Sequence, residues 1–83
     1  MKARIYLDDG LIYARLENGA LLYDADPVEL ADQLWSKNVS HDELELVGWH
    51  LDPDRALLIG QQIAIHARFR FHQKTSRSTS SQQ

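Results

Sequence analysis

The sequence predicts an α+β fold, in which an antiparallel sheet of about five strands packs against one main helix. Three observations support this class. Two Asx-Gly turns separate short alternating segments at the N-terminus, a capped amphipathic pattern follows over residues 26–38, and an almost perfect apolar–polar alternation spans Ile63–Phe71. The expected order is three strands, the main helix, a strand, a short helix or turn, and a last strand.

The chain is short enough to form one domain, which we expect to occupy residues 1–72. It has 83 residues, of which 43% are hydrophobic and 25% charged. The net charge of −3 is unevenly placed, with −7 on residues 1–61 and +4 on residues 62–83. Residues 73–83 have no apolar side chain and are rich in Ser, Thr and Gln, so we expect a disordered polar tail there.

The composition also excludes several classes of chemistry. The chain has no cysteine, which rules out disulfides, a thiolate nucleophile and cysteine–zinc sites. The N-terminus starts a strand pattern at once and has no apolar leader, and no apolar run is long enough to span a bilayer. We therefore expect a cytoplasmic protein that does not contact a membrane.

The first three strands are predicted at residues 3–8, 11–16 and 20–23. Asp9-Gly10 and Asn18-Gly19 separate them, and both dipeptides are typical of two-residue hairpin turns. Two such turns would pair Leu7 with Ile12 and Leu16 with Leu21, and would place the apolar residues, Tyr23 included, on one face. The same register sets Tyr6 against Tyr13 and Arg4 against Arg15 on the opposite face.

The main helix is predicted over residues 26–38 and should cover the apolar face of the sheet. Asp26 can cap it, Pro27 suits its first position and Glu29 completes a capping pattern. Its apolar stripe includes Leu34 and Trp35, and Trp35 is expected to anchor the core rather than to bind a ligand.

The rest of the chain is predicted to return to the sheet. Leu44–Leu51 alternates with a change of phase at Gly48, which favours a strand with a bulge at that glycine. Residues 52–60 follow as a turn or short helix, and Ile63–Phe71 as the last strand. The alternative is one helix from Pro53 to Phe71 with Leu57, Ile63 and Ala67 in a stripe, against which Gly60 and the alternation argue.

No residue pattern indicates catalysis or a cofactor. The histidines His41, His50, His66 and His72 form no metal-binding motif, and six residues of strand would separate His66 from His72 by about 20 Å. Serines and acids near His50 have no spacing that defines a nucleophile, base and orienting group. We expect a protein that is not an enzyme and holds neither cofactor nor metal.

The candidate site is the polar face of the predicted sheet, which would combine cations with aromatic rings. Its residues are Arg4, Tyr6, Tyr13, Arg15, His66, Arg68, Arg70 and His72. Arg and Tyr are enriched at protein interfaces, so we expect a protein–protein interaction module that acts as an adaptor or inhibitor and binds an acidic surface. Such small acidic chains are common among inhibitors encoded by phages and mobile elements, although no residue here requires that origin.

Two further partners are compatible with the same strands. An exposed edge strand could pair with a second copy to form a homodimer. The alternative function is binding of single-stranded nucleic acid on the same face, with bases stacked on the tyrosines and phosphates held by the cations. The sequence pI of 5.7 disfavours nucleic acid, because such proteins usually have a strongly basic footprint.

Overall fold

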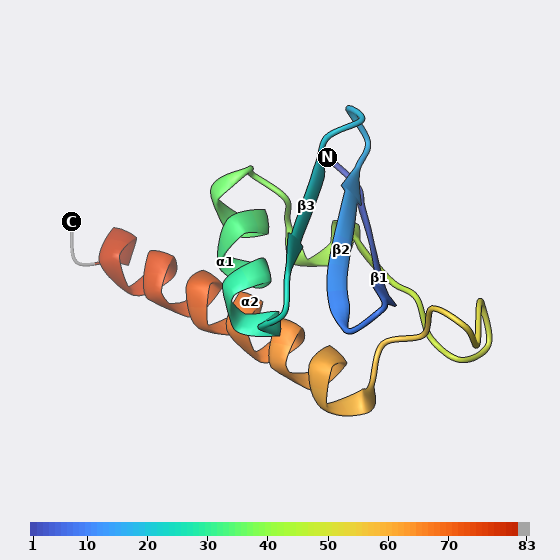
Figure 1. The fold of residues 1–83 in the computed structure, drawn as a ribbon. Helices are drawn as coiled ribbons and strands as arrows, with labels where there is room; N and C mark the ends of the chain where they lie inside the picture. The colour runs from blue at the N-terminus through green and yellow to red at the C-terminus, as the bar shows by residue number, and fades with distance from the viewer. Residues whose placement is uncertain (82–83) are drawn as a thin grey trace.

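The α+β class is confirmed in a computed structural model that describes residues 1–81, with side chains described through residue 75. A mixed sheet forms one layer, and helices α1 and α2 lie together against one of its faces (Figure 1). The elements are β1 (Ala3–Asp8), β2 (Leu11–Leu16), β3 (Leu21–Asp24), α1 (Pro27–Ser36), the 3₁₀ turn η1 (His41–Glu43), β4 (Leu44–Leu46) and α2 (Ile59–Ser81).

The sheet has four strands and is not wholly antiparallel, so the predicted five-stranded antiparallel sheet is wrong. Its order is β3-β2-β1-β4, and β4 runs parallel to β1. The helix α1 explains the parallel pair. It carries the chain back along the sheet after β3, so β4 must run in the same direction as β3 and β1.

The first hairpin has the predicted register. Asp9 and Gly10 both adopt positive φ, at 52° and 80°, as a two-residue turn of this type requires. Leu7 pairs with Ile12, and Ala3 pairs with Leu16 at the far end. The prediction of these two strands and of their buried face is confirmed.

The second hairpin differs from the prediction by one residue. The amide of Leu16 donates to the carbonyl of Ala20 at 2.8 Å, so the turn contains three residues and ends at Gly19, where φ is 94°. Tyr13 therefore pairs with Tyr23 rather than Ala14 with Tyr23. A one-residue shift moves every side chain of a strand to the other face. Tyr23 accordingly lies 60% exposed on the polar face, and the predicted inward position is wrong.

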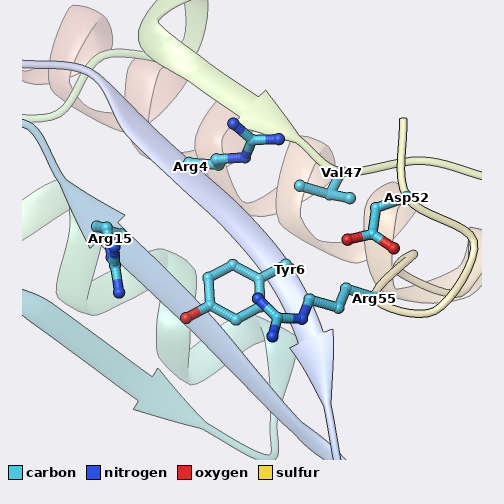
Figure 2. Close-up of a pocket in the computed structure, with 6 residues that line it drawn as sticks. All are labelled: Arg4, Tyr6, Arg15, Val47, Asp52 and Arg55. Atoms are coloured by element: carbon cyan, nitrogen blue, oxygen red, sulfur yellow. The ribbon is translucent and has the colours of Figure 1, made fainter. Parts of the chain in front are cut away.

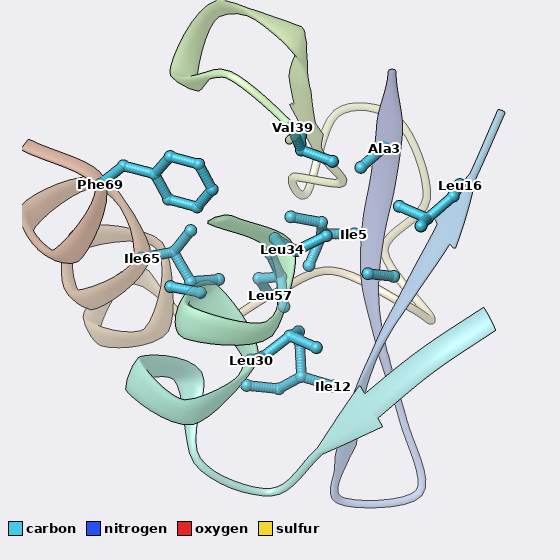
Figure 3. Packing of buried hydrophobic residues seen from close by; sticks show 12 residues of the cluster. Ala3, Ile5, Ile12, Leu16, Leu30, Leu34, Val39, Leu57, Ile65 and Phe69 are labelled. Atoms are coloured by element: carbon cyan, nitrogen blue, oxygen red, sulfur yellow. The ribbon is translucent and has the colours of Figure 1, made fainter. Parts of the chain in front are cut away.

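The core lies between the sheet and the two helices (Figure 3). Asp26 caps α1 as predicted, since its Oδ1 accepts from the amide of Val28 at 2.9 Å and Pro27 takes the first position. Trp35 packs against the core and its ring meets that of Phe69 edge-on at 5.8 Å. The buried core residues are Ala3, Ile5, Ile12, Ala14, Leu16, Leu30, Ala31, Leu34, Val39, Leu57, Ile65 and Phe69.

The predicted strand Leu44–Leu51 ends early, at Leu46. Val47 is buried and its amide donates to the carbonyl of Ile5 at 2.8 Å, but the chain then leaves the sheet. Trp49 is 73% exposed. Gly48 therefore lies in a loop rather than at a β-bulge, because the chain leaves the sheet after Val47.

The predicted last strand is wrong, since Ile63–Phe71 lies inside α2. Alternate residues of an α-helix are roughly 200° apart, so an apolar residue at every second position fills two opposite sides of a helix. Ile65 and Phe69 are fully buried, whereas Ile63 and Phe71 are 60% and 51% exposed. The alternative of one helix was nearer to the structure, although α2 begins at Ile59 and includes Gly60 in its first turn.

The predicted disordered tail at residues 73–83 stays a prediction. The backbone of α2 is helical through Ser81, and residues 82–83 lie outside the described part of the chain. Among the described residues, no helix is both long and apolar enough to cross a membrane.

Candidate functional site

The structure divides the eight predicted interface residues into two groups. Arg4, Tyr6, Tyr13 and Arg15 lie on the polar face of the sheet, as the hairpin register requires. The other four, His66, Arg68, Arg70 and His72, belong to α2, which packs on α1 on the opposite side of the sheet (Figure 1). The predicted single surface therefore does not exist, because it depended on Ile63–Phe71 joining the sheet.

Two residues of the α2 group hold the helices together. Arg68 donates to both carboxylate oxygens of Asp32 on α1, at 2.7 and 3.3 Å, and His72 Nε2 lies 2.6 Å from Asp32 Oδ1. The hydrogen bond from Arg68 lowers the pKa of Asp32. The ring of His72 also stacks on Trp35 at 5.0 Å. These contacts give Arg68 and His72 a structural role between α1 and α2.

His66 belongs to a second contact between elements. Its Nδ1 lies 2.7 Å from Nε2 of His41 in η1, so one ring donates and the other accepts. Burial lowers the pKa of His66, and the nearby His41 and Arg70 lower it further. His66 thus joins α2 to η1, the turn that precedes β4, whereas Arg70 is exposed.

The polar face of the sheet is not covered by any described element. We call it the open face and define it by the outward side chains of β1, β2 and β3 together with Arg55. Arg4 and Arg15 are exposed there, while Tyr6 and Tyr13 are partly exposed. Its full set is Arg4, Tyr6, Asp8, Leu11, Tyr13, Arg15, Leu21, Tyr23 and Arg55.

Three tyrosines form a row across the strands of the open face. The rings of Tyr6 and Tyr13 stack with centroids 5.5 Å apart and planes 17° apart, and Tyr13 and Tyr23 follow at 6.0 Å and 37°. The guanidinium of Arg55 lies 5.6 Å from the Tyr6 ring centroid. The ring faces of Tyr6 and Tyr13 are thus in contact with neighbouring rings or with Arg55. A partner can therefore reach the edges and hydroxyl groups of these two rings.

Beside this row, three arginines surround a hollow of about 230 Å³ (Figure 2). Arg4 and Arg15 pair directly across β1 and β2, an arrangement of like charges that destabilises a sheet. Arg55 arrives from the loop before α2, where its carbonyl accepts from the amide of Leu7 at 2.9 Å. The lining residues are Arg4, Tyr6, Arg15, Val47, Asp52 and Arg55, so three cations face one acid.

Few acids offset these arginines. Arg4 Nε lies 3.5 Å from Glu45 Oε1, but both side chains are 56% exposed and such surface pairs are weak. Asp52 is the acid in the lining of the hollow. The hollow thus offers hydrogen-bond donors and positive charge to an anionic group.

Three residues of the open face were not predicted from the sequence: Leu21, Tyr23 and Arg55. A two-residue turn at Asn18-Gly19 predicts that Leu21 and Tyr23 face the core. A three-residue turn ending at Gly19 is equally compatible with that dipeptide. Arg55 is brought to the sheet by the loop after Val47, and no local pattern in the sequence signals that return.

The described residues contain no group of three or more His, Asp or Glu side chains that could hold a metal ion. Comparison of the chain with protein-family models, curated proteins and solved structures found no match. Its function is therefore inferred from its own residues.

Proposed function

We propose that this protein is a non-catalytic interaction module that binds an acidic segment of a protein partner across the open face. The observation that supports the proposal is the row of Tyr6, Tyr13 and Tyr23 beside a hollow lined by three arginines. An adaptor or an inhibitor of a larger protein would use such a face.

The residue types favour a protein partner. Tyr and Arg are over-represented among residues that dominate binding energy at protein interfaces. Tyrosine offers a large rigid surface with a hydroxyl at its rim, and it loses little conformational entropy on binding. The exposed Leu21 and Tyr23 add an apolar edge beside the polar hollow.

The arginine hollow favours carboxylates on that partner. Guanidinium groups bind carboxylates through two parallel hydrogen bonds, which are stronger than bonds between neutral groups. A carboxylate placed between Arg4 and Arg15 would also relieve the repulsion between these two cations. We infer that an Asp or Glu side chain of the partner occupies the hollow while apolar neighbours pack on the tyrosines.

Single-stranded nucleic acid is the second candidate, because Tyr23 is 60% exposed and could stack on a base. Two observations weigh against it. The faces of Tyr6 and Tyr13 are stacked on each other rather than offered to bases. The chain has a net charge of −3 and lacks the strongly basic footprint that is usual among nucleic-acid-binding proteins.

Selection from a library of displayed random peptides tests the proposal. We expect the wild-type chain to enrich peptides that combine Asp or Glu with apolar or aromatic residues. The double variant Arg15→Gln/Arg55→Gln should lose that enrichment, because it removes two of the donors of the hollow. Lys37→Gln is the matched control, since Lys37 is an exposed cation at the end of α1.

Enrichment that survives in the double variant, or no enrichment at all, would count against the open face as a protein site. Fluorescence anisotropy with labelled single-stranded DNA tests the second candidate in parallel. Binding that weakens steeply with salt and disappears in Arg15→Gln/Arg55→Gln would favour nucleic acid.

A further inference from the structure

The side of α2 that faces away from the core is apolar as well. Ile59, Ile63, Ala67 and Phe71 follow one another at intervals of four residues, and we call them the outward row. Ile59 is 75% exposed, Ile63 60% and Phe71 51%. Within the row, Phe71 has a neighbour on its ring face, since the guanidinium of Arg68 in the same helix lies 4.5 Å from its centroid.

The outward row lies on the side of α2 opposite the buried residues. Ile65 and Phe69 point into the core (Figure 3) and are fully buried. Ile63 and Ala67 are each two residues away from Ile65, which places them roughly 160° from it around the helix axis. Helix α2 thus has two apolar sides, and the fold uses one of them.

Monomeric proteins rarely display several large apolar side chains in one continuous patch. Leu58, which precedes α2, is 62% exposed as well. In water, burying such side chains contributes roughly 25 cal/mol per Å² of apolar surface. A second helix with a matching row would supply that burial.

We propose that the outward row is the contact surface of a homodimer, in which α2 packs antiparallel against α2 of a second copy. A two-fold axis beside Ile65 would set Ile59 against Phe71 of the second copy, and Ile63 against Ala67 of the second copy. The row then matches itself, because a large side chain meets a small one at its centre. Such self-complementarity is what a two-fold interface requires.

The charges of α2 favour the antiparallel arrangement over a parallel one. The helix contains no acid between Ile59 and Ser81, and Arg70 and Lys74 lie on the same side as the row. Parallel packing would place each of these cations opposite the same residue of the second copy. In the antiparallel arrangement the two copies of Arg70 are about 15 Å apart along the axis, which exceeds the screening length at physiological salt.

The antiparallel arrangement also gives Arg70 room. It would lie opposite Gly60 of the second copy, where an added Cβ would meet nothing within 4 Å. The guanidinium could therefore cross the interface and reach water while its methylene stem packs on the neighbouring helix.

This dimer is independent of the proposed function, because the open face and α2 lie on opposite sides of the sheet (Figure 1). Both open faces would remain accessible. Two linked faces bind a partner with repeated acidic segments far more tightly than one face, as the second contact becomes intramolecular.

Sedimentation velocity of the full chain over a wide concentration range tests the dimer. We expect a reversible monomer–dimer equilibrium for the wild type. Ile63→Glu should weaken dimerisation at least tenfold, because it buries a charge at the centre of the row. Leu51→Glu is the matched control, since Leu51 is also 60% exposed but lies in the loop before α2. Circular dichroism verifies that both variants keep their helices.

Crosslinking tests the orientation, because the chain has no cysteine of its own. Equal amounts of Ile59→Cys and Phe71→Cys are mixed and treated with a short bismaleimide. Antiparallel packing predicts crosslinks between the two different variants. Crosslinks that join Ile59→Cys only to itself would contradict the antiparallel dimer.

Two outcomes would overturn the homodimer as a whole. One is a monomer at every concentration, and the other is dimerisation that Ile63→Glu leaves unchanged. A monomer that binds vesicles containing phosphatidylserine, and loses that binding in Ile63→Glu, would assign the row to a membrane surface instead. Peptide selection with Ile63→Glu separates the two proposals, since the open face should still enrich acidic peptides.

Discussion

Residues 3–8 and residues 63–71 alternate in the same way, yet the first segment is a strand and the second lies inside a helix. In β1, the alternation separates one buried face from one open face. In α2, it separates a buried row from an exposed apolar row on the opposite side. The same alternation of apolar residues therefore marks one buried face of the sheet in β1, but two opposite apolar sides of the helix in α2.

The comparison shows that alternation alone does not define a strand, because a strand also needs a neighbour to pair with. β1 finds that neighbour at once, since Asp9-Gly10 turns the chain back into β2. Residues 63–71 are followed by no turn dipeptide. Good helix formers, such as Ala64, Ala67 and Arg68, lie among them.

Truncation of two phenylalanines gives the largest contrast between these two structures. A strand would place Phe69 and Phe71 on the same face, whereas α2 buries Phe69 completely and leaves Phe71 51% exposed. We expect Phe69→Ala to lower the free energy of unfolding by about 3–5 kcal/mol. Phe71→Ala should change it by less than about 0.5 kcal/mol in the monomer.

Urea denaturation at low protein concentration measures both effects, since dilution removes any contribution from dimerisation. Equal losses for the two variants would mean that both rings are buried on one face. That result would contradict the helix.

Two glycines with different backbone conformations test the geometry of the turn that leads into β3. Gly19 has a φ of 94°, which an alanine adopts poorly, whereas Gly48 has an ordinary backbone conformation and open space around it. We expect Gly19→Ala to destabilise the protein by about 1–2 kcal/mol. Gly48→Ala should be neutral or slightly stabilising, because it restricts the unfolded chain. A harmless Gly19→Ala would argue against the positive φ of Gly19 in the turn that leads into β3.

The ion pairs between α1 and α2 should contribute less than the core. We expect Asp32→Asn to lower the free energy of unfolding by about 1 kcal/mol, because Asp32 is partly exposed. The folded protein lowers the pKa of Asp32 below its ordinary value of 3.8, so the stabilisation is present above that pH and is lost as the pH falls further. Thermal unfolding from pH 7 to pH 3 should show a smaller decrease for Asp32→Asn than for the wild type. Asp54→Asn, in an exposed loop, serves as the control.

The contact between His41 and His66 predicts the smallest effect. Burial and the neighbouring His41 and Arg70 lower the pKa of His66 below 6.5 in the folded protein, so the unfolded chain binds a proton first. Stability should therefore decrease as the pH falls through about 6.5. His66→Gln should flatten this part of the stability profile. A profile that stays equally steep in His66→Gln would assign the titration to another group.

Local chemistry accounts for what could be predicted from the sequence. Asp9-Gly10 and the Asp26-Pro27 cap specify the first hairpin and the start of α1 through contacts between near neighbours, and both were predicted correctly. The length of the second turn was not, because Asn18-Gly19 is compatible with two or three residues. Half of the predicted site, including Arg4 and Tyr6, lies on the open face for the same local reason.

The remaining features depend on long-range contacts. β4 pairs with β1 because α1 reverses the chain, and Arg55 reaches the sheet because the loop after Val47 returns to β1. Neither arrangement leaves a periodic signal. The two apolar sides of α2 were also hidden, since a pattern that would bury one face of a strand also describes a helix with one buried row and one exposed row.

Cysteine accessibility along α2 tests the division between the buried and outward rows most directly. In this cysteine-free chain, single variants Ile63→Cys, Ile65→Cys and Ala67→Cys can be labelled with a thiol reagent at concentrations that keep the protein monomeric. We expect rapid labelling at positions 63 and 67 and strong protection at position 65. Equal protection at all three positions would contradict this division, because that is the result expected of a strand with one buried face.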